Sequence, residues 1–333
     1  MAMSASALPT PLPWQQPLWQ HFLELYRSGR LPHALLLSGP HGVGKQRFAE
    51  ALLGYLLCAS PGDVACGQCH GCHMLASGYH PDLLRVSPEE GKRQIRIDPI
   101  REVNAFVAQT AQQGGHRVIV LSPAEAMNVA AANALLKSLE EPGQRTLFLL
   151  LADVPSRMLA TIRSRCQHWS LPLPEPEQSQ AWLTQQLGSR EEAEFWYRVS
   201  GNLPLLAAEL ATPESRALRK QLHETFDALV RGAEPVAEAA RLDRQSLESI
   251  LWYGIAWLED LIRLGLSGES AQLRNPDLLP LYRQAVKNAR VQDWFRLLDF
   301  AREQRRLLAS GGNPNPQLVL EAWLVRWSTL LRS

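Results

Sequence analysis

A glycine-rich loop at residues 39–46, with the sequence Gly-Pro-His-Gly-Val-Gly-Lys-Gln, constrains the fold more than any other feature. It follows a short apolar run, typical of a buried strand, and precedes a helical pattern over about residues 45–57. This spacing predicts a phosphate-binding loop, in which backbone N–H groups, a helix N-terminus and a lysine face phosphate. The candidate nucleotide-binding residues are Gly39, Gly42, Gly44 and Lys45.

Further buried strands are predicted in the first half of the chain, with helical segments between them. The predicted strands are residues 117–122, 146–152 and 167–171, and the helices are residues 18–28, 98–113, 129–141 and 155–165. This alternation is typical of an α/β fold with a parallel sheet. After the proline-rich residues 172–177 only helical patterns occur, two or three short ones and then about five longer ones. The second half is therefore expected to be all-α.

The charges nearly cancel, because 34 basic and 33 acidic residues give a net charge of +1. A freestanding nucleic-acid binder is usually strongly basic, so the balance argues against one, although it leaves room for a local basic patch. Eight of the ten tryptophans lie at residue 169 or later, and we expect them to fill helix–helix interfaces. The N-terminus lacks a secretory signal pattern and no apolar run is long enough to span a membrane, so a soluble, cytoplasmic protein is expected.

The residues that hydrolysis requires are missing around the loop. Gln46 stands where a serine or threonine hydroxyl would ligate Mg²⁺. Ser122 and Pro123 follow the second core strand, where an acidic pair would hold the metal and activate water, and Glu125 is expected to face the next helix start. The chain is therefore predicted not to hydrolyse ATP alone. Nucleotide binding without hydrolysis and a loop kept only for the fold both remain open.

Four of the five cysteines, Cys58, Cys66, Cys69 and Cys72, lie within fifteen residues. Their number and spacing predict a closed structural zinc site, with an iron–sulfur cluster and no metal as alternatives. A neighbouring histidine could replace one thiolate. With all four ligands from the protein, no position is open for catalysis. Cys166 is expected to be a small buried residue.

Three motifs together carry a family resemblance: Asn133–Pro142 (NALLKSLEEP), Thr161–Cys166 (TIRSRC) and the cysteine cluster. With them the chain resembles bacterial clamp-loader subunits of the AAA+ superfamily, and among these the delta-prime subunits of DNA polymerase III. The resemblance covers residues 30–215 and, more loosely, the rest. It implies an AAA+ domain over residues 1–171 with a zinc-knuckle insertion at 58–72. A helical lid at 172–213 and a helical collar, or oligomerisation domain, at 214–333 would follow.

The departures from the motor subunits' pattern imply an ATPase-inactive stator. The Walker B acids fall on Ser122 and Pro123, the sensor-1 residue near Ala152 or Asp153, and the sensor-2 arginine on Pro204. The resemblance implies a pentameric hetero-oligomer with motor (gamma/tau) and delta subunits. That complex would load the sliding clamp onto primed DNA as a component of the DNA polymerase III holoenzyme, with no membrane involved.

Arg165, with Ser164 in the same motif, is implied to act as an arginine finger in trans on a neighbour's ATP. Judged without the family, the same arginine would be a cation that satisfies carbonyls at a helix C-terminus. Two other classes of function remain as alternatives, a stand-alone P-loop NTPase and a zinc-dependent DNA-binding protein.

Overall fold

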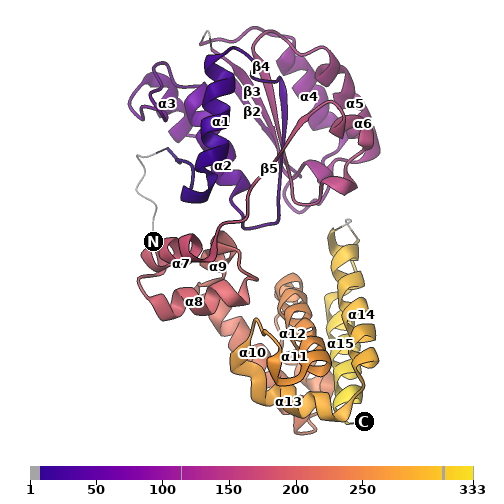
Figure 1. The fold of residues 1–333 in the computed structure, drawn as a ribbon. Coiled ribbons are helices and arrows are strands. Elements are labelled where there is room, and N and C mark those ends of the chain that lie inside the picture. Colours follow the sequence, from indigo (N-terminus) through magenta and orange to yellow (C-terminus); the bar gives the residue numbers. More distant parts are fainter. Residues whose placement is uncertain (1–7, 114, 310–311, 333) are drawn as a thin grey trace. The chain divides into compact units, whose positions relative to one another are not determined.

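The computed structural model describes residues 8–113, 115–309 and 312–332. The chain forms two compact units, Met1–Gln178 and Ser179–Ser333, which are described separately. The first holds the sheet and the second is built of helices (Figure 1). The three-domain division expected from the sequence stays a prediction.

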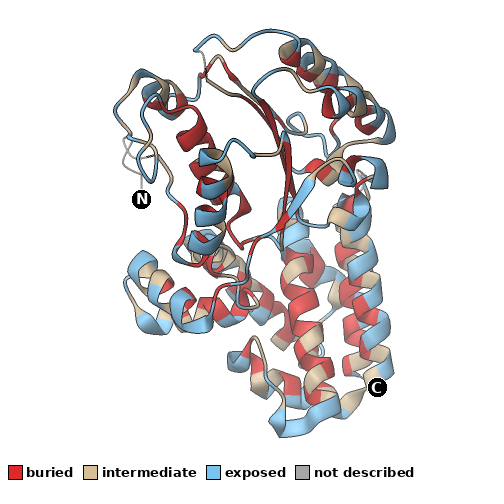
Figure 2. Ribbon diagram, turned by 45° about the horizontal axis from the view of Figure 1, so that its top comes forward, coloured by how far each residue is buried: buried red, intermediate tan, exposed pale blue. Residues whose placement is uncertain are grey.

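A five-stranded parallel sheet forms the centre of the first unit. Its strands lie in the order β2-β3-β4-β1-β5. Their bounds are β1 (Ala34–Ser38), β2 (Leu83–Val86), β3 (Arg117–Leu121), β4 (Thr146–Ala152) and β5 (Gln167–Ser170). Every residue of β1, β3 and β4 is buried, because helices cover both faces of the sheet (Figure 2). The predicted parallel α/β sheet is confirmed, whereas β2 was not predicted.

Two hydrophobic clusters flank this sheet, one on each face. Along β1, Leu35 and Leu37 point into one cluster and Leu36 into the other, as the alternation of strand side chains requires. The first cluster is closed by α1 (Gln16–Arg27) and α2 (Lys45–Leu56). The second is closed by α4 (Ile97–Val107), α5 (Val129–Glu140) and α6 (Ala160–Arg163).

Two predicted helices are shorter in the structure. The helix predicted over 98–113 ends at Val107, because competing side chains take up the backbone groups that would continue it. The buried Arg117 guanidinium donates to the Phe106 carbonyl, and the Asp82 carboxylate accepts from the N–H groups of Gln112 and Gln113. The helix predicted over 155–165 divides into a 3₁₀ turn, η3 (Pro155–Arg157), and the short α6.

The second unit is helical, as predicted. Its helices are α7 (Pro176–Leu187, which begins before the unit boundary), α8 (Arg190–Val199), α9 (Pro204–Leu210), α10 (Pro213–Val230), α11 (Pro235–Arg241), α12 (Leu247–Ser267), α13 (Leu279–Asn288), α14 (Val291–Ala309) and α15 (Pro316–Leu331). One continuous hydrophobic cluster runs from Leu183 to Leu331. The tryptophans fill it as expected, with Trp196, Trp257 and Trp323 almost fully buried. Among the described residues no helix is long and apolar enough to cross a membrane.

Candidate functional site

The phosphate-loop sequence has the backbone shape that its glycines allow. Residues 39–44 connect β1 to α2, and Gly39, Gly42 and Gly44 have φ angles of 149°, 85° and 102°. Residues other than glycine rarely adopt these φ angles. The loop therefore has the predicted strand–loop–helix context, with Lys45 as the first residue of α2.

The Lys45 side chain is engaged within its own chain. Its ammonium Nζ donates to the carbonyls of Gly39 at 2.8 Å and Pro40 at 3.0 Å. It also forms a 2.6 Å ion pair with Oδ1 of Asp153, directly after β4, and its side chain is only 9% exposed. These partners satisfy the three donors of a lysine ammonium, so a phosphate would have to displace at least one of them.

A segment just before α1 packs onto the same loop. The Gln15 amide is fully buried and donates to the Gly44 carbonyl at 2.9 Å, while its oxygen accepts from the Leu12 N–H. The indole of Trp14 donates to the Val43 carbonyl at 3.2 Å. A Cβ on Gly44 would lie 2.6 Å from the Gln15 amide nitrogen, so this approach requires glycine.

The neighbouring residues do not assemble a metal and water site. Gln46 is turned along α2 and donates to the Glu50 carboxylate at 3.0 Å. Ser122 follows β3, where its N–H donates to the Val86 carbonyl. Glu125 does not face the next helix start as expected. One of its carboxylate oxygens accepts from the N–H groups of Asp153 and Val154, at 2.8 and 3.0 Å.

Arg165 lies apart from these residues, after α6 and before β5. Its guanidinium donates to the Thr161 carbonyl at 2.9 Å and forms an ion pair with Glu140, the last residue of α5. Its side chain is 35% exposed. Two of the sequence motifs therefore meet in one contact, Glu140 from the first and Arg165 from the second. Ser164 donates to the Thr161 carbonyl at 3.1 Å and supports the same turn.

Cys166 is half-buried rather than buried, because it stands where the chain enters the edge strand β5. It packs on the second cluster of the sheet, and burial raises the pKa of its thiol to about 11. A neutral thiol in an apolar contact matches the packing role expected for it.

The four predicted metal-ligating cysteines lie together, with their sulfur atoms within 4.8 Å of one another. The Sγ–Sγ distance is 3.9 Å between Cys66 and Cys72 and 3.8 Å between Cys58 and Cys69. Zn–S bonds of about 2.3 Å in a tetrahedron place sulfurs about 3.8 Å apart, which these two pairs match, so the cluster is compatible with such an ion.

Backbone donors around the sulfurs favour the thiolate form that a metal needs. The N–H groups of Ala59, Cys66 and Cys69 each point to a cysteine sulfur at 3.4 Å. The effect differs between the four thiols: burial opposes ionisation of Cys69, but the hydrogen bonds that it accepts outweigh burial and lower its pKa to about 6, whereas burial raises the pKa of Cys58 and Cys72. The last of the four cysteines, Cys72, lies on α3 (His70–Ala76), a helix that was not predicted. Gly71 lets α3 approach the Leu57 carbonyl, because a Cβ there would lie 2.3 Å from that oxygen.

Comparison with known proteins decides the family. The family model described as "DNA polymerase III, delta subunit" matches residues 14–175, and one for "DNA polymerase III, delta subunit, C terminal" matches residues 213–329. A DNA polymerase III subunit delta′ from Pseudomonas aeruginosa is 38% identical over 96% of this chain and 97% of that protein. The chain belongs to the delta-prime family of DNA polymerase III.

Other members of the delta-prime family are similarly close. The subunit delta′ of Escherichia coli K12 is 32% identical over 94% of both chains. A solved structure of a gamma-subunit-related protein from Thermotoga maritima has a TM-score of 0.46 and 15% identity, and covers 93% of this chain and 99% of that one. The expected α/β unit with a parallel sheet, followed by a helical region, is confirmed by the strands and helices themselves.

Sequence reasoning missed the partners that hold the predicted residues. Asp153 was considered only as a sensor position, and neither Gln15 nor Glu140 was considered for a role. Gln15 lies 29 residues from the loop that it contacts, and Glu140 lies 25 residues from Arg165. The acid at the end of the first motif, Glu140, was a signal that could have suggested a partner for the arginine.

Proposed function

We propose that this chain is the ATPase-inactive stator of the DNA polymerase III clamp loader and donates Arg165 in trans to the ATP of a neighbouring motor subunit. In this role it helps to load the sliding clamp onto primed DNA during replication. The observation that carries the proposal is the contrast between two cations. Lys45 is occupied inside its own phosphate loop, whereas Arg165 is held at the surface by one carboxylate and one carbonyl.

The proposed inactivity rests on the surroundings of the loop. The lysine that would face the β- and γ-phosphates is paired with Asp153, and Gln46 is hydrogen-bonded to Glu50. The position after β3 offers Ser122 and Pro123 instead of two carboxylates, so it supplies neither a negative charge for a divalent cation nor a base that accepts a proton at neutral pH. We therefore assign the loop a structural role.

The proposed finger rests on chemistry that arginine supplies. A guanidinium is always charged and can donate two parallel hydrogen bonds to phosphate oxygens. Supplied in trans, it stabilises the charge that develops on the transferred phosphoryl group. Moving Arg165 from Glu140 to a phosphate would exchange one anionic partner for another.

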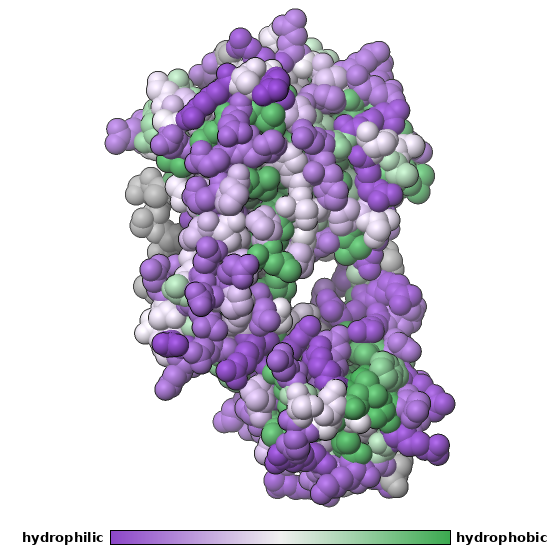
Figure 3. All heavy atoms as spheres, in the orientation of Figure 1, coloured by the Kyte–Doolittle hydropathy of each residue, from purple (hydrophilic) through white to green (hydrophobic). Residues whose placement is uncertain are grey.

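The proposed partners are motor (gamma/tau) and delta subunits in a pentameric, cytoplasmic loader. Apolar side chains are exposed on the last two helices, with Phe295 on α14 and Leu318 and Val325 on α15 between 42% and 62% exposed. Apolar residues also gather over the α13–α15 end of the helical unit on the face drawn in Figure 3. Such surfaces favour protein contacts, which supports a collar role for residues 214–333. Residues 172–213 are proposed as the lid.

We also propose that Cys58, Cys66, Cys69 and Cys72 bind one structural Zn²⁺. The sulfur spacing and the N–H donors support this assignment. The bound ion would fix residues 58–72 onto the α/β unit, and with four protein ligands it would leave no position for substrate.

The arginine finger is tested by Arg165→Ala and Arg165→Lys in a loader reconstituted with motor and delta subunits. We expect assembly to be unchanged and DNA-stimulated clamp loading to fall about tenfold or more, because one ATP site loses its transition-state cation. Arg163→Ala is the matched control, since Arg163 is an exposed arginine two residues away. Unchanged loading by the Arg165 variants would refute the finger role.

A further inference from the structure

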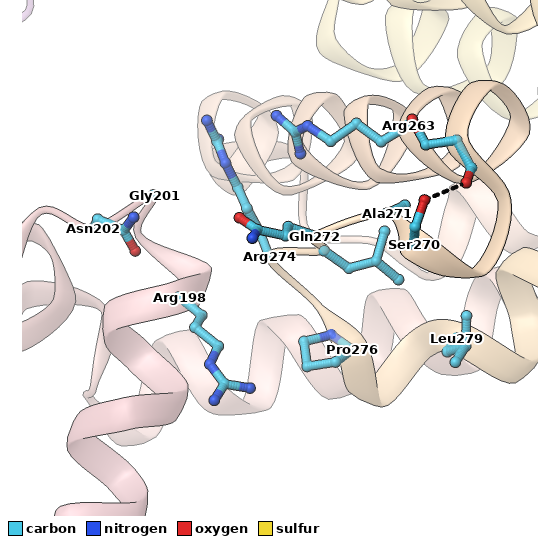
Figure 4. Close-up of a pocket in the computed structure, with 12 residues that line it drawn as sticks. Arg198, Gly201, Asn202, Arg263, Ser270, Ala271, Gln272, Arg274, Pro276 and Leu279 are labelled. Carbon is cyan, nitrogen blue, oxygen red and sulfur yellow. Dashed lines mark hydrogen bonds between the residues drawn. The ribbon is translucent and has the colours of Figure 1, made fainter.

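The helical unit contains a cavity of about 780 Å³ that the proposed function does not use. It lies between the end of α8 with the turn that follows, and the end of α12 with the segment leading to α13 (Figure 4). Three arginines line it, Arg198, Arg263 and Arg274, together with the amides of Asn202 and Gln272. No acidic side chain is among its described lining residues, so the cavity favours an anionic ligand.

The basic side chains come from two opposite walls. Figure 4 shows Arg198 on the α8 side and Arg263 and Arg274 on the other. Among the residues that the structure describes, the Arg198 guanidinium has no hydrogen-bond or ion-pair partner, and the side-chain amides of Asn202 and Gln272 have none either. One complete guanidinium and two neutral amides are therefore available to a ligand.

The two arginines of the opposite wall retain part of their donor capacity. Arg263 pairs with Asp260 at 2.8 Å and Arg274 with Glu259 at 3.4 Å. The Asp260 carboxylate is fully buried and also accepts from the N–H groups of Arg274 and Asn275. An arginine has five N–H donors, so both can bind a further anion while keeping these contacts.

The turn after α8 is shaped to fit the opposite wall. Gly201 and Asn202 have φ angles of 75° and 69°, and the Arg274 guanidinium lies over Gly201. A Cβ on Gly201 would lie 3.2 Å from Cζ of Arg274, closer than most side-chain contacts. The glycine thus keeps Arg274 beside the turn that presents Asn202.

We propose that this cavity binds the phosphate backbone of a single-stranded nucleic acid. Guanidinium groups on two walls suit a ligand with successive phosphates better than one compact anion. Leu273, Pro276 and Leu279 supply an apolar surface for a sugar or base between them. The inference does not depend on Arg165 or on the zinc site.

The test is binding of a fluorescently labelled oligothymidylate of about ten nucleotides to the full chain, measured by anisotropy over a range of salt concentrations. We expect saturable, salt-dependent binding, several-fold weaker in Arg198→Gln. One lost phosphate contact should reduce the slope of log K against log salt by about 0.7. Arg244→Gln is the matched control, because Arg244 is exposed, has no side-chain partner in the described structure and lies outside the cavity.

A second arm separates a strand from a free anion. Inorganic diphosphate is titrated into the same proteins and should compete only weakly with the oligonucleotide. Three results would overturn the proposal: no binding of the oligonucleotide at low salt, equal binding by the Arg198 and Arg244 variants, or tight diphosphate binding without strand binding. Circular dichroism of each variant excludes misfolding. Clamp loading is also measured with a loader that contains Arg198→Gln. This assay tests the Arg165 finger, so the result for the cavity and the result for the finger are obtained separately.

Discussion

Lys45 and Arg165 differ in how readily an external anion could bind them. Lys45 is buried, and its ammonium is already paired with the Gly39 and Pro40 carbonyls and the Asp153 carboxylate. Arg165 has an ion pair that is open to water, and such pairs contribute only about 0–1 kcal/mol. A ligand can therefore recruit the arginine at low cost, whereas recruiting the lysine requires breaking buried contacts.

From the pairing of Lys45 we predict that the isolated chain does not bind ATP. Titration with a fluorescent ATP analogue and Mg²⁺ should give no saturable signal up to about 1 mM, a concentration that corresponds to about 4 kcal/mol of binding free energy. Asp153→Ala removes one partner of Lys45 and should strengthen binding if that ion pair is the obstacle. Micromolar binding by the unaltered chain would contradict the structural role of the loop.

Between elements, Gly254 of α12 and Trp323 of α15 form a close contact. A Cβ on Gly254 of α12 would lie 2.1 Å from Cζ2 of Trp323 on α15, and Trp323 is fully buried. Phe226 meets the same indole edge-on, with ring centroids 5.6 Å apart. The absence of a side chain at residue 254 therefore sets how closely the two helices approach.

Gly254→Ala is expected to lower the free energy of unfolding by about 1–3 kcal/mol, because the added methyl overpacks the contact with Trp323. On an exposed helix the same change would stabilise by about 1 kcal/mol. Urea denaturation measures the difference. The double variant Gly254→Ala/Trp323→Leu should lose less unfolding free energy than the sum of the losses of the two single variants. Additive losses would count against the steric explanation.

Across the molecule, each unit has a core of its own, and the cysteine cluster belongs to the first. Seven of the ten tryptophans lie in the second unit, from Trp182 to Trp327. Indole fluorescence therefore reports mainly on the helices, although the Trp19 indole, which donates to the Asp63 carbonyl at 2.9 Å, also reports on the cysteine segment.

Metal analysis should find one zinc and no iron per chain, and a strong chelator should lower the melting temperature of the first unit only. The physical reason is that ion binding stabilises the state that holds the site. Calorimetry and tryptophan fluorescence, recorded together, separate the two units. Cys166→Ser is the control, since its sulfur lies outside the cluster, and it should leave metal content unchanged. Iron in the preparation, or a melting temperature that the chelator leaves unchanged, would contradict this assignment.

Sequence patterns predicted the features that depend on neighbours in the chain. The loop at Gly39–Lys45, strands β1, β3, β4 and β5 and the helical second half follow from local periodicity and glycine placement. Strand β2 was missed because the exposed Arg85 interrupts its short apolar run and only Val86 is buried. The Lys45–Asp153 and Glu140–Arg165 pairs and the three-arginine cavity join residues far apart in sequence, and only the folded backbone brings them together.

The ion pair between Glu140 and Arg165 has a further consequence for a finger that acts in trans. Glu140 is an internal competitor, so engagement with a neighbour is an exchange reaction rather than the capture of a free cation. The equilibrium of this exchange depends on how much more negative charge the neighbour's group carries than the Glu140 carboxylate. A terminal phosphate carries more charge than a carboxylate, and an interface without that phosphate offers no such gain. In the proposed finger role, the contact would thus make Arg165 engage a neighbour that carries ATP in preference to an empty one.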